Sequence, residues 1–169
     1  MGVKTRPAVS SWVAPPDPLR QTSRWLPPQV NFLKINFDGA WQLNSFKAAL
    51  VAEAAAGLCA IKYAISRGYR KIILEKDSKV LVKGTRGASN NGLWAVKPLL
   101  DEYDKLSSFF SDVKWNWVPR HLNRAAHKAA AIGARAVQLD CWAVRPPPSL
   151  VGVLVSDGLP CPPVEVSAQ

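Results

Sequence analysis

Short apolar runs alternate with longer stretches of helical spacing along the middle of the chain. Three runs are apolar or alternate with period two, which is typical of strands: 33–38, 71–75 and 113–118. Two stretches, 48–66 and 92–110, repeat apolar side chains every three or four residues and predict helices. Further helices are expected over 78–84 and over 123–138, which is rich in alanine. The order strand, helix, strand, two helices, strand, helix favours an α/β fold with parallel strands.

The two ends of the chain have a different composition from the middle. The chain holds 14 prolines, and most of them lie in the terminal stretches. We interpret residues 1–30 as a flexible proline-rich arm, 31–140 as the folded domain and 141–169 as a proline-rich tail. Within the tail, the apolar stretch from Leu150 to Val155 is able to dock on the domain.

The charge of the chain favours a polyanionic partner. The formal net charge is +10, and residues 33–139 contain seventeen basic and eight acidic side chains. Such an excess on a folded domain is typical of proteins that bind nucleic acid. A basic surface with no nucleic-acid partner is the alternative.

The cysteine pattern and the hydropathy pattern bear on location. Cys59, Cys141 and Cys161 have no paired spacing, so we expect a reducing, intracellular compartment, nuclear or cytoplasmic. No secretory signal is evident, and no apolar stretch is expected to reach the length of a membrane span. We expect a monomer without a membrane partner.

Three acidic residues stand where an α/β fold places its chemistry. Asp38 ends the first predicted strand, Glu53 lies near the start of the first helix, and Asp77 ends the second strand. Each has a simpler explanation. Asp38 and Gly39 can form a plain turn, Glu53 can complement the helix dipole, and Asp77 can cap the next helix.

The two histidines lie near the last predicted helix. His127 is on that helix, which Asn123 is expected to cap, and His121 is in the preceding loop. An exposed helix histidine without function is the alternative for His127. A plain loop residue is the simpler interpretation of His121, with proton transfer or phosphate contact as the other.

The order of these stretches resembles the plant reverse-transcriptase-like ribonuclease H domains, a branch of the ribonuclease H-like superfamily. The similarity covers about residues 25–140. The stretches that carry it are Trp25 with Pro27-Pro28, Lys34-Ile35-Asn36-Phe37-Asp38-Gly39-Ala40, Ala52-Glu53-Ala54, Leu74-Glu75-Lys76-Asp77-Ser78, and Val118-Pro119-Arg120 with Asn123 and Ala126-His127. The resemblance implies a three-layer α/β/α fold.

The resemblance also implies an activity, namely hydrolysis of the RNA strand of an RNA–DNA hybrid with two Mg²⁺ or Mn²⁺ ions. Asp38, Glu53, Asp77 and His127 fall on the four positions that hold the metals in the family. His127 departs from the acidic residue expected there. Because imidazole is a poorer ligand for Mg²⁺ than carboxylate, we expect Mn²⁺ to be preferred.

A second departure concerns the sheet. The family has two antiparallel strands between its first two acids, whereas Glu53 follows Asp38 by only 15 residues. Two more strands do not fit there. We therefore expect a sheet reduced to about three parallel strands, in the order 1-2-3, with helices on both faces and the first strand at an edge.

Three functions remain open from the sequence. The first is a metal-dependent ribonuclease H, impaired by the missing strands. The second is a non-catalytic nucleic-acid-binding module, and the third is a retroelement-derived relic. Candidate nucleic-acid contacts are Lys34, Lys47, Arg120, Arg124 and Lys128, with Trp41 or Trp115 available for stacking on bases.

Overall fold

The computed structural model describes residues 25–40, 46–85, 94–136, 142 and 145–159. The described residues contain one parallel sheet of three strands in the order β1-β2-β3, as expected. Its strands are β1 (Leu33–Asn36), β2 (Lys71–Lys76) and β3 (Asp112–Trp117). Asn36 pairs with Glu75 and Glu75 with Asn116, so the carboxyl ends of all three strands meet at one edge of the sheet.

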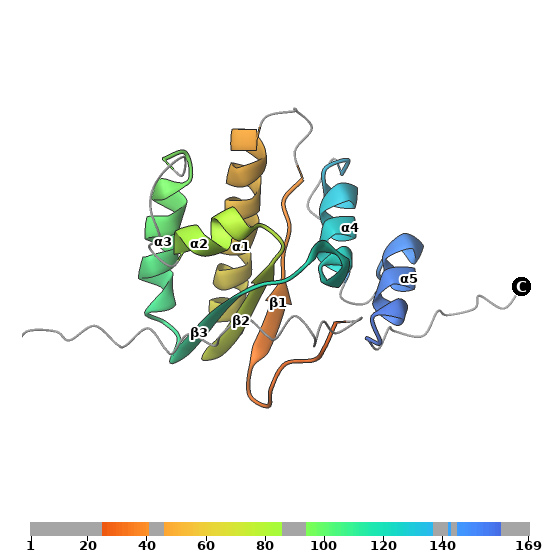
Figure 1. The fold of residues 1–169 in the computed structure, drawn as a ribbon. Helices are drawn as coiled ribbons and strands as arrows, with labels where there is room; N and C mark the ends of the chain where they lie inside the picture. Colours follow the sequence, from red (N-terminus) through yellow and green to blue (C-terminus); the bar gives the residue numbers. More distant parts are fainter. Residues whose placement is uncertain (1–24, 41–45, 86–93, 137–141, 143–144, 160–169) are drawn as a thin grey trace, which may run out of the picture.

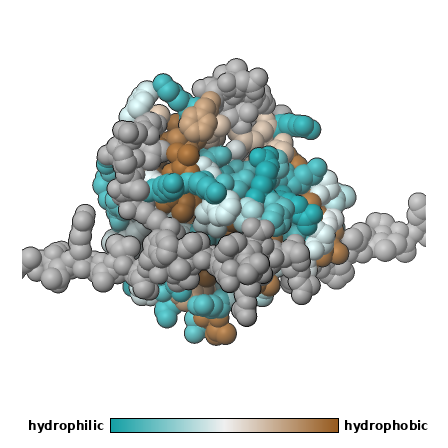
Figure 2. Space-filling model, viewed as in Figure 1, coloured by the Kyte–Doolittle hydropathy of each residue, from teal (hydrophilic) through white to brown (hydrophobic). Residues whose placement is uncertain are grey.

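Five α-helices and one short 3-10 helix surround this sheet in the described residues. They are α1 (Phe46–Ser66), α2 (Lys79–Thr85), α3 (Lys97–Ser107), η2 (Arg120–Leu122), α4 (Arg124–Gly133) and α5 (Pro148–Ser156). In Figure 1, α1 and α3 stand together on one side of the molecule, and α4 and α5 stand beyond β1 on the other. Hydrophilic residues gather over α4 in Figure 2.

The core lies between the sheet and the α1–α3 layer. Ile72 and Leu74 of β2 are fully buried against α1, which contributes Ala54 and Ile61. Tyr103 of α3 donates a hydrogen bond from its hydroxyl to the backbone carbonyl of Ala54. This bond satisfies a buried phenol and joins the two helices.

The length of α1 corrects one expectation. This helix has 21 residues and a mean hydropathy of 1.6, which is long and apolar enough to cross a membrane by length and composition alone. The expectation that no stretch reaches this length is therefore wrong. A core helix passes the same test, and α1 packs on the sheet and on α3 through Leu50, Ala54, Gly57, Ile61 and Ala64.

The position of β1 confirms the expected consequence of the shortened sequence. β1 pairs only with β2 among the described residues and so lies at an edge of the sheet. Phe37 extends this pairing by one bond, because its backbone N–H donates to Glu75 O at 3.3 Å. Asp38 therefore follows directly on paired backbone, which fixes its position.

Two helices are shorter than the sequence pattern predicts. α3 begins at Lys97 rather than near residue 92, because Pro98 occupies its first turn, where a missing N–H costs nothing. α4 ends at Gly133, a poor helix former, and is followed by a turn. Residues 137 and 138 lie outside the described part.

Neither the expected cap at Asn123 nor the alternative of a cap at Asp77 is found in the structure. Ser78, not Asp77, caps α2, since its Oγ accepts a hydrogen bond from Leu81 N at 3.4 Å. Asn123 precedes α4 but makes no side-chain cap bond. Its amide is engaged elsewhere, with Phe37 O and Asp77.

The apolar stretch near the C-terminus forms α5 and docks on α4, as expected for Leu150 to Val155. Leu150 is buried, and Arg124 Nη2 lies 2.6 Å from both Asp157 Oδ1 and Ser156 Oγ. The Asp157 side chain is only 4% exposed. An ion pair and an apolar contact therefore join this stretch of the proline-rich tail to the domain.

Candidate functional site

Asp38 and Glu53 are brought together by a close contact between backbones. Gly39 N donates to Asp38 Oδ1 at 2.9 Å and fixes the carboxylate at the end of β1. A Cβ on Gly39 would lie 2.4 Å from Ala52 C and Glu53 N, so only glycine allows this approach to α1. The loop after β1 therefore lies directly against the turn of α1 that carries Glu53.

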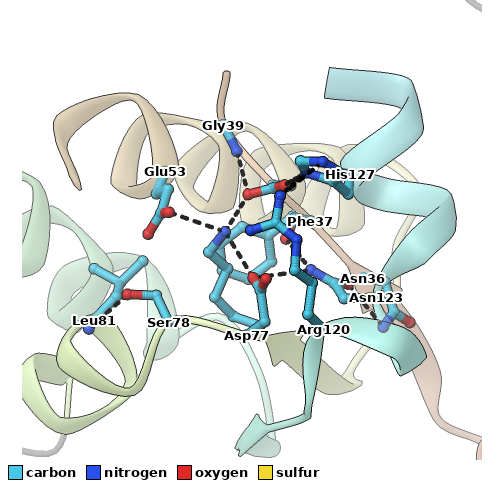
Figure 3. Close-up of polar contacts among 12 residues, drawn as sticks. Asn36, Phe37, Gly39, Glu53, Asp77, Ser78, Leu81, Arg120, Asn123 and His127 are labelled. Carbon is cyan, nitrogen blue, oxygen red and sulfur yellow. Dashed lines mark hydrogen bonds and ion pairs between the residues drawn. The ribbon is translucent and has the colours of Figure 1, made fainter. Parts of the chain in front are cut away.

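Lys76 lies at the centre of the three predicted acids. It is the last residue of β2, and its side chain is fully buried. Its Nζ donates a hydrogen bond to Asp38 Oδ1 and lies 3.3 Å from Asp77 Oδ1 and 3.5 Å from Glu53 Oε1. Figure 3 shows Glu53 and Asp77 reaching this point from two different elements.

His127 joins the same cluster from α4. Its Nδ1 lies 2.9 Å from Asp38 Oδ2, and its Nε2 lies 2.8 Å from Arg120 Nη2. A guanidinium only donates, so Nε2 accepts and Nδ1 carries the proton that is donated to Asp38. In the Nδ1–H tautomer, both ring nitrogens of His127 are engaged.

Asn123, between η2 and α4, forms hydrogen bonds next to the acid cluster. It is 1% exposed, and its Nδ2 donates to Phe37 O at 3.1 Å and to Asp77 Oδ1 at 3.3 Å. Its Oδ1 accepts from Asn36 Nδ2, which also donates to Glu75 Oε2, both at 3.2 Å. One amide thus ties the ends of β1 and β2 to the start of α4.

The pKa values follow from this geometry. Burial raises the pKa of Asp38, but the hydrogen bond and charge of Lys76 and the hydrogen bonds from His127 and Gly39 outweigh it. The result is a pKa below the ordinary 3.8. Burial raises the pKa of Glu53 above 4.5, and Lys76 offsets this only in part. The ammonium thus stabilises the ionised form of Asp38 more than that of Glu53.

As they lie here, these acids do not fit a divalent metal ion. The ammonium of Lys76 fills the space between the three carboxylates that a shared ion would need. Within the ranges that the structure describes, no group of three His, Cys, Asp or Glu side chains is arranged to hold a metal. The site is therefore a buried cation surrounded by acids.

The predicted nucleic-acid contacts are placed in two regions. Arg120 and Lys128 lie with Arg124 on η2 and α4, beside His127, and Arg124 is paired with Asp157. Lys34 is 11% exposed and lies 2.9 Å from Glu75 Oε1, on the sheet face that also carries Asn36. Lys47 Nζ lies 4.7 Å from the centre of the Trp94 ring.

The predicted stacking residues have different surroundings. Trp115 packs in the core, 6.3 Å from Phe37 and 5.1 Å from Tyr103 between ring centres, which leaves its ring unsuited to a base. Trp41 lies outside the described residues. Trp117 and Trp94, 42% and 67% exposed, each lie under a lysine, Lys79 and Lys47. The sequence interpretation missed both.

Lys76 and Asn123 are the site residues whose roles sequence reasoning missed. The signal for Lys76 was its position in a strand of a parallel sheet, where both faces are buried and a charge requires a partner. Its three partners, Asp38, Glu53 and Asp77, had instead been predicted to hold metal ions. For Asn123 the sequence offered a cap, which concealed its contact with Asp77.

Comparison with known proteins identifies the family of the chain. Residues 35–133 match the model of the reverse transcriptase-like family. No curated protein matches the chain. RNase H1 from the halophilic archaeon Halobacterium salinarum is similar at 26% identity, over 51% of this chain and 67% of that one, with a TM-score of 0.47. The N-terminal RNase H domain of a Mycobacterium tuberculosis protein, solved as a fusion with maltose-binding protein, has the same identity and coverage and a TM-score of 0.41. Since the family model spans more than half of the sequence, the chain belongs to the reverse transcriptase-like family and has a reduced ribonuclease H-like α/β fold.

Proposed function

We propose that this domain binds nucleic acid, with an RNA–DNA hybrid as the first candidate, and that it does so without hydrolysing the RNA strand. The single observation that carries the proposal is the position of Lys76 Nζ among Asp38, Glu53 and Asp77. The family activity needs these carboxylates for two Mg²⁺ or Mn²⁺ ions, one to activate water and one to stabilise the leaving oxygen. An ammonium group performs neither task.

A second candidate function rests on a different observation. Asp38, Glu53, Asp77 and His127 all converge on one point, although they come from different parts of the chain. This convergence favours divalent-metal-dependent cleavage of RNA–DNA hybrids. Cleavage would require Lys76 to leave the carboxylates and His127 to release Arg120.

The binding surface that we propose lies on η2 and α4. Arg120 is exposed, Lys128 is one residue beyond His127, and Arg124 keeps about half of its side chain exposed while it pairs with Asp157. Cationic side chains beside one another attract phosphates and release counterions. On the other side of the acids, Trp117 donates from Nε1 to Asp77 O at 2.9 Å and offers a ring for stacking.

The experiment measures binding and cleavage of one labelled RNA–DNA hybrid. Anisotropy between about 50 and about 200 mM salt should show affinity that falls steeply, because counterion release dominates such binding. In Mg²⁺ and in Mn²⁺, the same hybrid should stay intact on a gel. Cleavage that Asp38→Asn abolishes would support the second candidate, and affinity that does not change with salt would contradict binding through basic residues.

A matched pair of variants locates the surface. Arg120→Ala with Lys128→Ala should weaken binding and lower the slope of log K against log salt by about 1 for each phosphate that the protein no longer neutralises. Lys105→Ala should leave both unchanged, because Lys105 is a 75% exposed lysine of α3, on the opposite side of the sheet. Equal effects of the two changes would exclude the α4 surface.

A further inference from the structure

The buried ammonium of Lys76 balances charges that a metal ion would otherwise balance. Three carboxylates lie around one point, with exposed side-chain fractions of 8% for Asp38, 21% for Glu53 and 14% for Asp77. Three such groups without a cation between them would repel one another at low dielectric. Lys76 contacts all three.

We propose that Lys76 is a built-in cation that takes the place of a divalent ion and that removal of its charge converts the cluster into a divalent-cation site. The proposal concerns the same acids as the proposed function and rests on it. The two remain separable, because metal affinity is measured without nucleic acid and hybrid binding is measured without metal.

The surroundings of Lys76 hold the ammonium in place. Its side chain is 0% exposed, and Nζ lies 5.9 Å from the centre of the Phe37 ring. Asp38, its closest partner, is fixed by Gly39 N and by His127 Nδ1. Since the chain itself supplies this cation at fixed concentration, a free divalent ion must displace a group that never diffuses away.

The acids suit a hard cation once the ammonium is removed. Mg²⁺ and Mn²⁺ prefer carboxylate oxygens, and three are within reach of one point here. A shorter neutral side chain at position 76 would leave room for an ion and its bound water. The three carboxylates that surround Lys76 in the natural chain would then become ligands of the ion.

A second lysine, largely shielded from solvent, provides the matched control. Lys34 Nζ lies 2.9 Å from Glu75 Oε1, and both side chains are nearly buried, at 11% and 7% exposed. Lys34 pairs with this one carboxylate, whereas Lys76 contacts three. Loss of charge at Lys34 should therefore cost stability without creating a cation site.

The test is calorimetric titration of the full chain with Mn²⁺ and with Mg²⁺, together with thermal unfolding at increasing Mn²⁺. We expect no saturable binding for the natural chain or for Lys34→Gln. Lys76→Gln and Lys76→Thr should bind Mn²⁺ at least about tenfold more tightly than the natural chain does. The Tm of both variants should rise with Mn²⁺ concentration. Addition of Asp38→Asn to Lys76→Gln should remove the gained affinity.

Several outcomes would overturn the proposal. Mn²⁺ affinity of the natural chain equal to that of the Lys76 variants would show that the ammonium excludes nothing. Failure of both Lys76→Gln and Lys76→Thr to gain Mn²⁺ affinity, whether they fold or not, would also contradict it. A variant that folds only when Mn²⁺ is present supports the proposal, since the ion then replaces the missing charge.

Discussion

Asn123 Nδ2 lies 3.3 Å from Asp77 Oδ1, so the residue that precedes α4 holds the carboxylate that follows β2. The same amide also donates to Phe37 O and is almost completely buried. Two acceptors, one just beyond β1 and one just beyond β2, therefore depend on one side chain.

Replacement of Asn123 by alanine should destabilise the domain. The change leaves Phe37 O without the amide donor and removes a partner of Asn36, and such unsatisfied buried groups cost about 1–3 kcal/mol. Urea unfolding measures the difference in free energy. His121→Ala, at an exposed position of η2 two residues earlier, should change the stability by less than about 0.5 kcal/mol. Equal losses at the two positions would contradict a bridging role for Asn123.

Substitution of Gly39 by alanine should separate Asp38 from Glu53. The new Cβ would lie 2.4 Å from backbone atoms of α1, which cannot yield as a side-chain tip does. We expect a loss of stability of about 1–3 kcal/mol in chemical unfolding. Gly152→Ala is the control, because no atom lies within 4 Å of its added Cβ and α5 gains helix propensity. A stable Gly39→Ala chain would show that the loop can leave α1 freely.

The stability of the domain should fall at acidic pH as Asp38 becomes protonated. Because the pKa of Asp38 is lower in the folded state than its ordinary 3.8, the unfolded chain binds this proton more tightly. The stabilisation by ionised Asp38 is thus present above 3.8 and is lost as the pH falls toward the folded value. Asp38→Asn should flatten this decline in urea unfolding measured at several pH values.

Ionisation of Glu53 should lower the stability of the domain in the same measurement, whereas ionisation of Asp38 raises it. Its pKa in the folded state is raised above 4.5, so the folded chain holds this proton more tightly than the unfolded chain. Stability should therefore fall as the pH rises from 4.5 through the folded value, and Glu53→Gln should remove that fall. The same slope in both variants would exclude the unequal effect of Lys76 on the two acids.

Loss of the charge at Arg124 should loosen α5. Arg124 Nη2 donates to Asp157 Oδ1, a buried acceptor, and an unpaired acceptor of this kind costs about 1–3 kcal/mol. Arg124→Gln should accelerate backbone hydrogen exchange in α5 and leave β2 protected. Arg135→Gln, at an exposed position just beyond α4, should leave α5 exchange unchanged. Unchanged exchange in Arg124→Gln would show that apolar packing alone holds α5.

The sequence predicted the sheet and the meeting of the acids for a shared physical reason. In a parallel sheet the carboxyl ends of all strands lie at one edge, so Asp38 and Asp77 had to approach one another. The 15-residue spacing to Glu53 placed the start of α1 at the same edge. The same short spacing leaves no room for two more strands, so it also predicted the position of β1 at an edge of the sheet.

The rest depended on contacts that sequence spacing does not contain. A lysine at the end of a strand usually reaches solvent, but Lys76 is fully buried, and its Nζ lies 3.5 Å from Glu53 Oε1 of α1. The two roles of Asn123, cap or bridge, differ only in where one amide points. α1 ends at Ser66, and Gly68 follows with a φ of +75°, the left-handed conformation that is common just after helices.

The central claim is that Lys76, rather than a divalent ion, neutralises the three carboxylates. The most direct measurement is an NMR titration of the ¹⁵N-labelled natural chain with paramagnetic Mn²⁺. The ammonium signal of Lys76 should be visible, because the group is buried and hydrogen-bonded, and it should persist when the exposed acids Asp101 and Glu102 are already broadened. The account is contradicted if Mn²⁺ broadens the Lys76 ammonium and the backbone amides of Gly39 and Asp77 before it affects those exposed acids.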